Sequence, residues 1–205
     1  MNNSLQEYLN FANKLADVAG ITSMEYFRTS LSIDNKSDES PVTIADKNTE
    51  LKIRSLIENE YPDHGILGEE FDSVNPDAEF IWVIDPIDGT RSYIAGHKDF
   101  GNLIALTQNK KPIIGIINCP AHEERWVGAK NQSSTVNQQT ANTSSVTAIE
   151  DAYIFTSGLY FDEPHLRNAV DKIKNKVRYF RYGGDCYMYG MVASGLIDIV
   201  IEDTL

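Results

Sequence analysis

The chain has 205 residues, of which 41% are hydrophobic and 23% are charged, a composition typical of a globular protein that can bury a sizeable core. Its formal net charge of -12 argues against general binding to nucleic acid or to anionic membranes, because both require a basic surface. Cys119 and Cys186 match no zinc or redox spacing and favour a reducing compartment. The N-terminus lacks a signal-peptide pattern, and no run of about eighteen apolar residues predicts a membrane span. We therefore expect a soluble cytoplasmic protein.

Two amphipathic helices are predicted near the start of the chain. Apolar residues recur at three- and four-residue steps from Leu5 to Ala19, which predicts a helix that extends towards Phe27. The polar stretch 29–41 predicts a mobile loop. A second helix fits Thr43 to about Glu60, with Thr43 as its N-cap.

After the second helix the pattern becomes that of strands. They are predicted for "GILGEE", "FIWVID", "FGNLIALT", "PIIGIINC" and "RWVGA", and "NKKP" is predicted to be the turn of a hairpin. The stretch 130–147 is rich in Asn, Gln, Ser and Thr and predicts an exposed hairpin or loop. The strands "AYIFTS", "VRYFRY" and "LIDIVIED" then alternate with helices at 164–175 and 185–195. This order indicates a layered α/β or α+β fold with a second half that starts near residue 140.

Carboxylates follow two of the predicted strands and open the second helix. "LGEE" ends with Glu69 and Glu70, "WVIDPIDGT" contains Asp85 and Asp88, and Asp46 lies in the first turn of the helix. Because the ends of neighbouring strands lie close together, these carboxylates can converge. Clustered carboxylates repel one another and are costly to bury in ionised form, so a hard cation would stabilise them. Oxygen ligands of this kind favour Mg²⁺.

The turn between the two aspartates has the composition of an anion site. Pro86 restricts the backbone so that both carboxylates can aim at one point, with the carbonyl of Ile87 between them. Gly89 and Thr90 then offer backbone N–H groups, which bind phosphate if a helix or turn starts there. Two metals about 3.5–4 Å apart can polarise a phosphoryl group and generate hydroxide from water. The pattern therefore predicts a metal centre that handles phosphate.

Each of these motifs also has a purely structural explanation. Gly-Glu-Glu is usually a solvated turn, "DPIDGT" consists largely of turn-forming residues, and Asp46 could simply complement a helix dipole. The joint occurrence of the three in this order favours the metal centre. An acidic Ca²⁺-binding module is disfavoured, because the acids do not follow the alternating spacing of an EF-hand loop.

The chain resembles the inositol monophosphatase superfamily of Mg²⁺-dependent, lithium-sensitive phosphatases. The stretches that carry the resemblance are "SPVTIADKNTE", "YPDHGILGEE", "WVIDPIDGTRSYIAG" and "GGDCYMYGMVASGLIDIVIED". The wording of "DGTRSYIAG" and "GGDCYMYG" looks most like the histidinol-phosphate phosphatase branch. The resemblance implies a homodimer with a layered αβαβα fold. Residues 1–140 would bind metal and phosphate and residues 141–205 would select the substrate, as two halves or as one continuous domain.

The resemblance also implies roles for individual residues. Two or three Mg²⁺ ions would be bound by Glu69, Asp85, the carbonyl of Ile87 and Asp88. Thr90 and Asp46 would orient and help to deprotonate the attacking water, and the amides of Gly89 and Thr90 would hold phosphate oxygens. Water would attack phosphorus in line with the ester oxygen, without a phosphoenzyme. The loop around Lys36 corresponds to a segment that is mobile in relatives and orders with metal.

Substrate choice is expected to depend on the second half. Asp185 and Glu202 fall where relatives contact the part of the substrate beyond the phosphate. Two carboxylates there would suit a cationic amine such as histidinol, or would accept hydrogen bonds from sugar hydroxyls. Asp185 could instead cap the helix that follows it, and Glu202 could be an exposed strand end. Cys186 is expected to be a small buried residue and not a nucleophile.

The sequence thus predicts a Mg²⁺-dependent phosphomonoesterase whose substrate is a small phosphate monoester such as histidinol phosphate. Inositol 1-phosphate or another sugar phosphate is the alternative substrate, and an inactive phosphate-binding scaffold is the alternative of another class. The chain stops at "IVIEDTL", before the Trp-Asp or Tyr-Asp motif whose aspartate ligates the second metal in relatives. A C-terminal part truncated in this way would bind the second metal weakly and turn over slowly, which would favour the scaffold.

Overall fold

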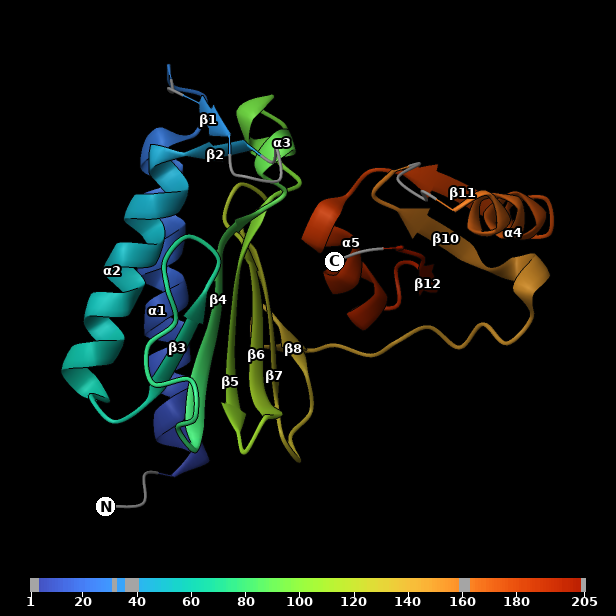
Figure 1. Ribbon diagram of the computed structural model, residues 1–205. Coiled ribbons are helices and arrows are strands. Elements are labelled where there is room, and N and C mark those ends of the chain that lie inside the picture. The colour runs from blue at the N-terminus through green and yellow to red at the C-terminus, as the bar shows by residue number, and fades with distance from the viewer. Residues whose placement is uncertain (1–3, 31–32, 36–40, 159–162, 204–205) are drawn as a thin grey trace.

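The structure of the protein is a computed structural model, and the residues that it describes are 4–30, 33–35, 41–158 and 163–203. Layers of helix and sheet alternate through the molecule (Figure 1). Helices α1 (Leu5–Tyr26) and α2 (Ile44–Glu60) cover one face of a seven-stranded sheet. Helix α5 (Asp185–Ala193) lies between that sheet and a three-stranded sheet, and α4 (Pro164–Lys174) lies beyond the smaller sheet. The layered α/β fold is therefore confirmed.

Both long helices begin where the sequence predicts, because each has a capping box. The Ser4 hydroxyl accepts a hydrogen bond from the Glu7 N–H, and the Glu7 carboxylate accepts one from the Ser4 N–H. Thr43 and Asp46 form the same reciprocal pair at the start of α2. The apolar faces of the two helices and the inner face of the large sheet then form the main core, whose most deeply buried members include Leu15, Ile53, Ile57, Trp82 and Leu106.

The large sheet brings the carboxyl ends of two strands side by side. Its strands, in spatial order, are β3 (Gly65–Gly68), β4 (Phe80–Asp88), β5 (Gly101–Gln108), β6 (Lys111–Cys119), β7 (Glu124–Ala129), β8 (Thr135–Val136) and β9 (Gln139–Thr140). Strands β3 and β4 are parallel, and every later neighbour is antiparallel. The predicted hairpin is the β5–β6 pair. The parallel pair places the residues that follow β3 next to those that end β4.

A bulge and a short helix shape the chain at the end of β4. Asp85 pairs with Leu103 and Asp88 pairs with Gly101, so two residues of β4 face one residue of β5. Helix α3 (Thr90–Ile94) follows immediately, with Gly89 as its N-cap at φ 78°. A Cβ at Gly89 would lie 2.9 Å from the Cβ of Asp185, so both the backbone angle and the space require glycine.

The smaller sheet is parallel throughout, and its last strand is shorter than predicted. Strand β10 (Tyr153–Thr156), after the 3₁₀ helix η1 (Ile149–Asp151), lies between β11 (Tyr179–Tyr182) and β12 (Ile199–Val200). Most of "LIDIVIED" is therefore not a strand. Side chains add to the backbone bonds at both ends: the Asp198 carboxylate accepts from the Tyr153 N–H at 2.6 Å and the Glu202 carboxylate from the Ser157 N–H at 2.7 Å.

Helix α5 packs closely against the outer face of the large sheet. A Cβ at Gly190 would lie 2.5 Å from the Trp126 ring, so glycine lets the helix lie directly on that side chain. The Trp126 indole N–H also donates to the Ser194 hydroxyl at 2.7 Å. On its other side α5 packs against the smaller sheet through Met188 and Phe155. The helix therefore packs against both sheets and fills the space between them.

The polar stretches have more regular structure than the sequence indicates. The predicted loop at 29–41 contains β1 (Ile33–Asn35), which pairs antiparallel with β2 (Pro41–Thr43), while Lys36 lies outside the described residues. Strands β8 and β9 form the exposed hairpin expected within 130–147. The connection to the smaller sheet follows β9, close to residue 140, but the division into halves at that point stays a prediction. Among the helices of the described ranges, none is both long and apolar enough to cross a membrane.

Candidate functional site

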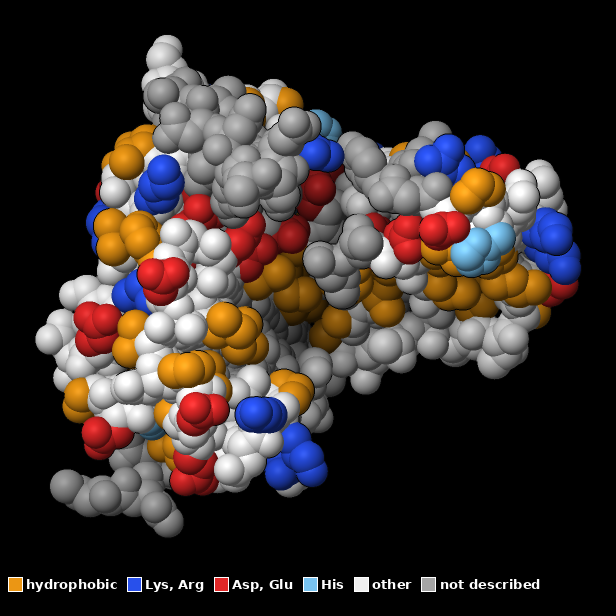
Figure 2. Space-filling view, in the orientation of Figure 1, with side chains coloured by type: hydrophobic (Ala, Val, Ile, Leu, Met, Phe, Trp, Pro, Cys, Tyr) orange, Lys and Arg blue, Asp and Glu red, His pale blue; other side chains and the backbone are white. Residues whose placement is uncertain are grey.

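Acidic side chains from separate stretches of the sequence lie together at the carboxyl ends of β3 and β4. The carboxyl groups of Glu69 and Asp85 share a hydrogen bond. Glu69 is also close enough for its charge to raise the pKa of Asp46 and of Asp88. Figure 2 shows acidic side chains gathered in the notch between the large sheet and the part of the chain that forms the smaller sheet. The three motifs singled out in the sequence therefore form one cluster.

Burial controls the protonation of this cluster. It is the largest cause that raises the pKa of Asp85 to about 9, followed by the charges of Glu69 and Asp88. Burial also raises the pKa of Asp46 and of Asp88, although hydrogen bonds from Thr43 and Cys186 respectively oppose the shift. The pKa of Asp85 therefore lies above neutral pH in the metal-free chain, where its protonated form is favoured. A cation that binds here would displace that proton.

Asp46 connects the cluster to the first turn of α2. Its Oδ2 accepts hydrogen bonds from the Thr43 N–H at 2.8 Å and the Thr43 hydroxyl at 2.6 Å. Its Oδ1 lies 3.4 Å from the Thr90 hydroxyl, which also lies 3.0 Å from the carbonyl oxygen of Ile87. One hydroxyl hydrogen cannot serve both acceptors fully. Thr90 is thus held between a carboxylate and a backbone carbonyl of the turn.

The first turn of α5 reaches into the same cluster. The Cys186 N–H donates to Asp88 Oδ2 at 2.7 Å. The Asp185 carboxylate accepts a hydrogen bond of 2.6 Å from the Ser92 hydroxyl. The backbone of Asp185 has a positive φ of 40°. Gly184 is the N-cap of α5, so the alternative that Asp185 caps the helix is wrong. The Cys186 side chain is buried, as expected.

Glu202 follows β12 and lies close enough to Asp185 for its charge to act on that carboxyl group. Its carboxylate accepts from the Ser157 N–H at 2.7 Å and from the Ser157 hydroxyl at 2.5 Å. Its charge contributes to the raised pKa of Asp185, of which burial is the largest cause. Tyr189 lies close to the same groups, and burial followed by the charges of Glu202 and Asp88 raises its pKa to about 12. The Glu202 carboxylate is thus held in place by Ser157 and is not a free strand end.

Sequence reasoning missed a buried ion pair that holds the turn after β3. Glu50 is fully buried, and its Oε1 accepts from Arg54 Nε at 2.7 Å. Its Oε2 accepts from the Glu70 N–H at 2.8 Å, while Arg54 donates to the Phe71 carbonyl at 2.9 Å. A Cβ at Gly68 would lie 2.0 Å from Glu50 Oε1, so the strand passes directly over the carboxylate. The pair therefore fixes the peptide next to Glu69.

Replacing Arg54 with methionine is expected to lower the free energy of unfolding by about 3–5 kcal/mol, because it leaves the Glu50 carboxylate buried without its partner. Urea unfolding followed by circular dichroism measures the change. Lys52→Met is the matched control on the same helix, because Lys52 is 48% exposed and a surface change costs about 0.5 kcal/mol or less. Equal losses in the two variants would show that the buried pair does not stabilise the fold.

The donor atoms of the cluster fit a hard cation. Within the ranges that the structure describes, no three His, Cys, Asp or Glu side chains form a ready-made metal cage. The available donors are the carboxylates of Glu69, Asp85 and Asp88 together with the carbonyl of Ile87, all of them oxygen atoms. Mg²⁺ prefers oxygen and usually keeps several waters, so it needs few protein ligands. Burial and the charges of Glu69 and Asp88 raise the pKa of Asp85, so a cation at this position would relieve the cost of the ionised carboxylates.

A hollow adjoins the acidic cluster on the outer face of the large sheet. It measures about 460 Å³ and is lined mainly by apolar residues, with Asp85 at its edge and Ala193 of α5 on its far wall. Figure 2 shows apolar side chains inside this recess, directly below the acidic ones. A small molecule whose charged end meets the carboxylates could therefore lie partly in an apolar recess.

Comparison with known proteins gives consistent matches. The sequence model of the Inositol monophosphatase family matches residues 4–205. The chain is 39% identical over 203 residues to the bifunctional phosphatase IMPL2, chloroplastic, of Arabidopsis thaliana. That match covers 98% of this chain and 59% of the Arabidopsis protein. The chain is 36% identical to a histidinol-phosphatase of Chlorobaculum parvum, over 95% of this chain and 76% of that protein. A solved inositol monophosphatase from Zymomonas mobilis is 42% identical, with a TM-score of 0.88 over 100% of this chain and 79% of that chain.

Proposed function

Since this chain belongs to the inositol monophosphatase family of phosphatases, we propose that it hydrolyses a small phosphate monoester at the acidic cluster. Members of the family act on such substrates and are generally Mg²⁺-dependent. The observation that carries the proposal is the contact between the carboxyl groups of Glu69 and Asp85 beside Asp88, with Asp46 and Thr90 next to them. A site that raises carboxyl pKa values so far is arranged to receive positive charge.

We propose that Mg²⁺ is held by Glu69, Asp85, the carbonyl of Ile87 and Asp88, and that the number of ions is two or three. Bound there, Mg²⁺ would polarise the phosphoryl group and lower the pKa of water. The N–H groups of Gly89 and Thr90, at the start of α3, would hold phosphate oxygens, because the first amides of a helix have no partner within it.

Asp46 and Thr90 would handle the proton of the attacking water. The Thr90 hydroxyl is divided between Ile87 O and Asp46 Oδ1. Engagement of the Ile87 carbonyl by a cation would leave Asp46 as the stronger acceptor for this hydroxyl. Thr90 could then accept a hydrogen bond from water while donating to Asp46. Thr43 keeps the Asp46 carboxylate in place for this role.

For the substrate we propose a phosphate ester that also carries a cationic amine, such as histidinol phosphate. Asp185 and Glu202 are close enough to influence each other, and an ammonium group between them would neutralise both. Inositol 1-phosphate or another sugar phosphate is the second candidate, because the solved Zymomonas mobilis relative is an inositol monophosphatase. The homodimer, the cytoplasmic location and the scaffold alternative stay predictions.

Phosphate release in the presence of Mg²⁺ tests the function. We expect kcat/KM for histidinol phosphate to exceed that for inositol 1-phosphate and for a nucleotide 3′-phosphate. Asp185→Asn should lower kcat/KM for histidinol phosphate by about 10-fold, the effect of one charge-assisted hydrogen bond, with a much smaller effect on inositol 1-phosphate. Asp171→Asn, an exposed change on α4, is the control.

Three outcomes would contradict this proposal. Phosphate release that survives EDTA would exclude the metal-dependent reaction. A preference for inositol 1-phosphate that Asp185→Asn does not alter would show that the substrate is a sugar phosphate and not an ester that carries an amine. Absence of turnover together with retained metal and phosphate binding would favour the scaffold.

A further inference from the structure

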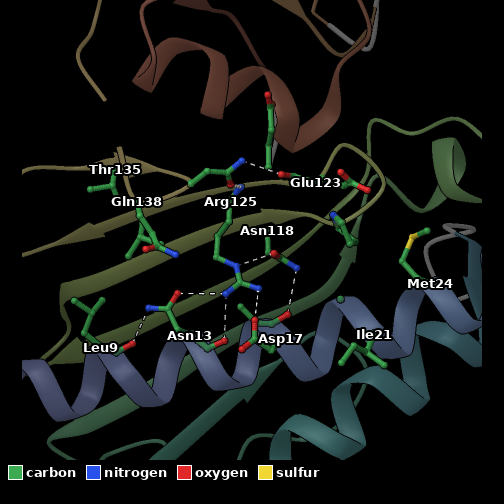
Figure 3. A pocket seen from close by; sticks show the side chains of 16 residues that line it. Leu9, Asn13, Asp17, Ile21, Met24, Asn118, Glu123, Arg125, Thr135 and Gln138 are labelled. Atoms are coloured by element: carbon green, nitrogen blue, oxygen red, sulfur yellow. Dashed lines mark hydrogen bonds and ion pairs between the residues drawn. The ribbon is translucent and has the colours of Figure 1, made fainter. Parts of the chain in front are cut away.

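A line of hydrogen-bonded side chains connects the helical side of the large sheet with the turn between Asp85 and Asp88. Figure 3 shows its outer part, in a hollow of about 1000 Å³ between α1 and the β6–β7 region. Arg125 donates to the Asp17 carboxylate at 2.7 Å and, through Nε, to the Asn118 side-chain oxygen at 2.8 Å. Asn118 donates to the Asn102 side-chain oxygen at 2.8 Å. Asn102 donates to the Pro86 carbonyl at 2.7 Å.

The two ends of this relay fix the direction of every bond in it. A guanidinium can only donate, so Asn118 must turn its oxygen towards Arg125 and its nitrogen inwards. Asn102 must then accept from Asn118 and present its own nitrogen to Pro86. The Pro86 carbonyl can only accept, so both ends require the same orientation of the two amides. Asn102 is fully buried and Asn118 is 5% exposed, so water cannot easily replace either bond.

The inner end of the relay holds a peptide group that matters for the acidic cluster. Asn102 is the single β5 residue opposite Pro86 and Ile87 in the bulge. The peptide between those two residues accepts from Asn102 at its carbonyl and donates from the Ile87 N–H to Asp85 Oδ1 at 3.1 Å. Because a peptide group is planar, fixing its oxygen also fixes its N–H. The Asn102 amide therefore sets the direction of a hydrogen bond to the Asp85 carboxylate.

We propose that Asn102 is a positioning residue for the metal-binding turn, and that Asn118 and Arg125 orient its amide; the role rests on the proposed function. The relay holds the bulge in the shape that aims Asp85 and the Ile87 carbonyl. Loss of the Asn102 donor would leave the buried Pro86 carbonyl without that partner and allow the peptide to rotate. Metal binding would weaken, while contacts to the rest of the substrate would not change.

Hydrogen exchange on the metal-free protein is the first test. We expect amides 87–90 to exchange about 10-fold faster in Asn102→Leu, which removes the bond to Pro86 itself. We expect about 3-fold faster exchange in Asn118→Leu and Arg125→Met, which remove bonds further along the relay. The matched control is Ile104→Val, two residues along β5 on the same buried face. It removes core volume without touching Pro86, so amides 87–90 should exchange as in the wild type.

Binding of Mn²⁺ without substrate, followed by electron paramagnetic resonance, is the second test. We expect an affinity about 10-fold lower in Asn102→Leu, and a substrate KM at saturating metal within about 2-fold of the wild type. Unchanged exchange at 87–90 in folded Asn102→Leu would overturn the inference. If that variant does not fold, unchanged exchange in Arg125→Met, at the outer end of the relay, would overturn it instead. A wild type that binds no Mn²⁺ would refute the proposed function, and exchange rates alone would then decide the role of Asn102.

Discussion

Asp85→Asn is expected to lower kcat by about 10³-fold or more, because it removes the carboxylate on which the cation site depends. The Asp85 carboxyl group lies in contact with that of Glu69 and is the strongest candidate to bind a cation together with it. Asparagine has almost the same shape and can still donate to Glu69, so the fold should persist. Phosphate release at saturating Mg²⁺ and Mn²⁺ binding without substrate measure the two consequences. Unchanged turnover would refute the metal-dependent mechanism.

The same variant should alter how stability depends on pH. The pKa of Asp85 is about 9 in the folded metal-free chain, and in the unfolded chain it is near the ordinary aspartate value of 3.8. Between these values the folded state binds a proton that the unfolded chain has lost. The free energy of unfolding therefore falls as pH rises from about 4 to 9, by up to about 1.4 kcal/mol per unit.

Urea unfolding of the metal-free protein at pH 5 and pH 8 measures this slope. We expect the wild type to lose stability between the two values and Asp85→Asn to lose much less. Mg²⁺ should restore the wild type at pH 8, because the cation takes the place of the proton. Asp171→Asn serves as the control and should follow the wild type. Identical slopes in wild type and Asp85→Asn would place the titrating group elsewhere.

Asp46→Asn is expected to lower kcat by about 10²–10⁴-fold, the range for loss of a general base, with little effect on metal affinity. The amide oxygen of asparagine can still accept from the Thr43 N–H, so the cap of α2 is preserved. What it cannot do is take a proton passed on by Thr90. Burial raises the pKa of Asp46, so the wild-type kcat should fall with decreasing pH at a higher pH than for an ordinary carboxylate.

Substitutions at Thr90 provide the control for this second result. Thr90→Ser keeps the hydroxyl and should retain most of the activity, whereas Thr90→Val should lose about as much as Asp46→Asn. Because the two residues would act as a unit, the double variant should be little worse than either single one. Fully additive losses would mean that Asp46 and Thr90 work independently.

Features encoded within a few residues were predictable from the sequence. The Thr43 N-cap of α2 and the "NKKP" hairpin each depend on neighbours in the chain. The stretch between Asp85 and Asp88 is predicted to be a turn after the strand, but it is a bulge inside β4. The layered fold followed from the order of such segments, and the convergence of Glu69 with Asp85 followed from the rule that neighbouring strand ends lie close together.

Features that depend on tertiary partners were not predictable. Glu50 and Arg54 are spaced like an ordinary surface pair on a helix, and only the strand that passes over them reveals their burial. The orientation of the Asn102 amide depends on Asn118 and Arg125, which are distant in sequence. The Asp198 and Glu202 side chains, which bind backbone N–H groups of Tyr153 and Ser157 beside the short β12, likewise depend on partners far away in the sequence.

The hydrogen bond from the Cys186 N–H to Asp88 links metal binding at the acidic cluster to the packing of α5 and the smaller sheet against the large sheet. Asp88 belongs to the large sheet, while Cys186 opens the helix that packs on the smaller one. A cation that binds more tightly when α5 is packed against the large sheet must, by thermodynamic reciprocity, stabilise that packing. Moderate hydrostatic pressure or dilute urea that separates the smaller sheet from the large sheet should therefore release Mg²⁺ before either sheet unfolds. Added Mg²⁺ should oppose this separation.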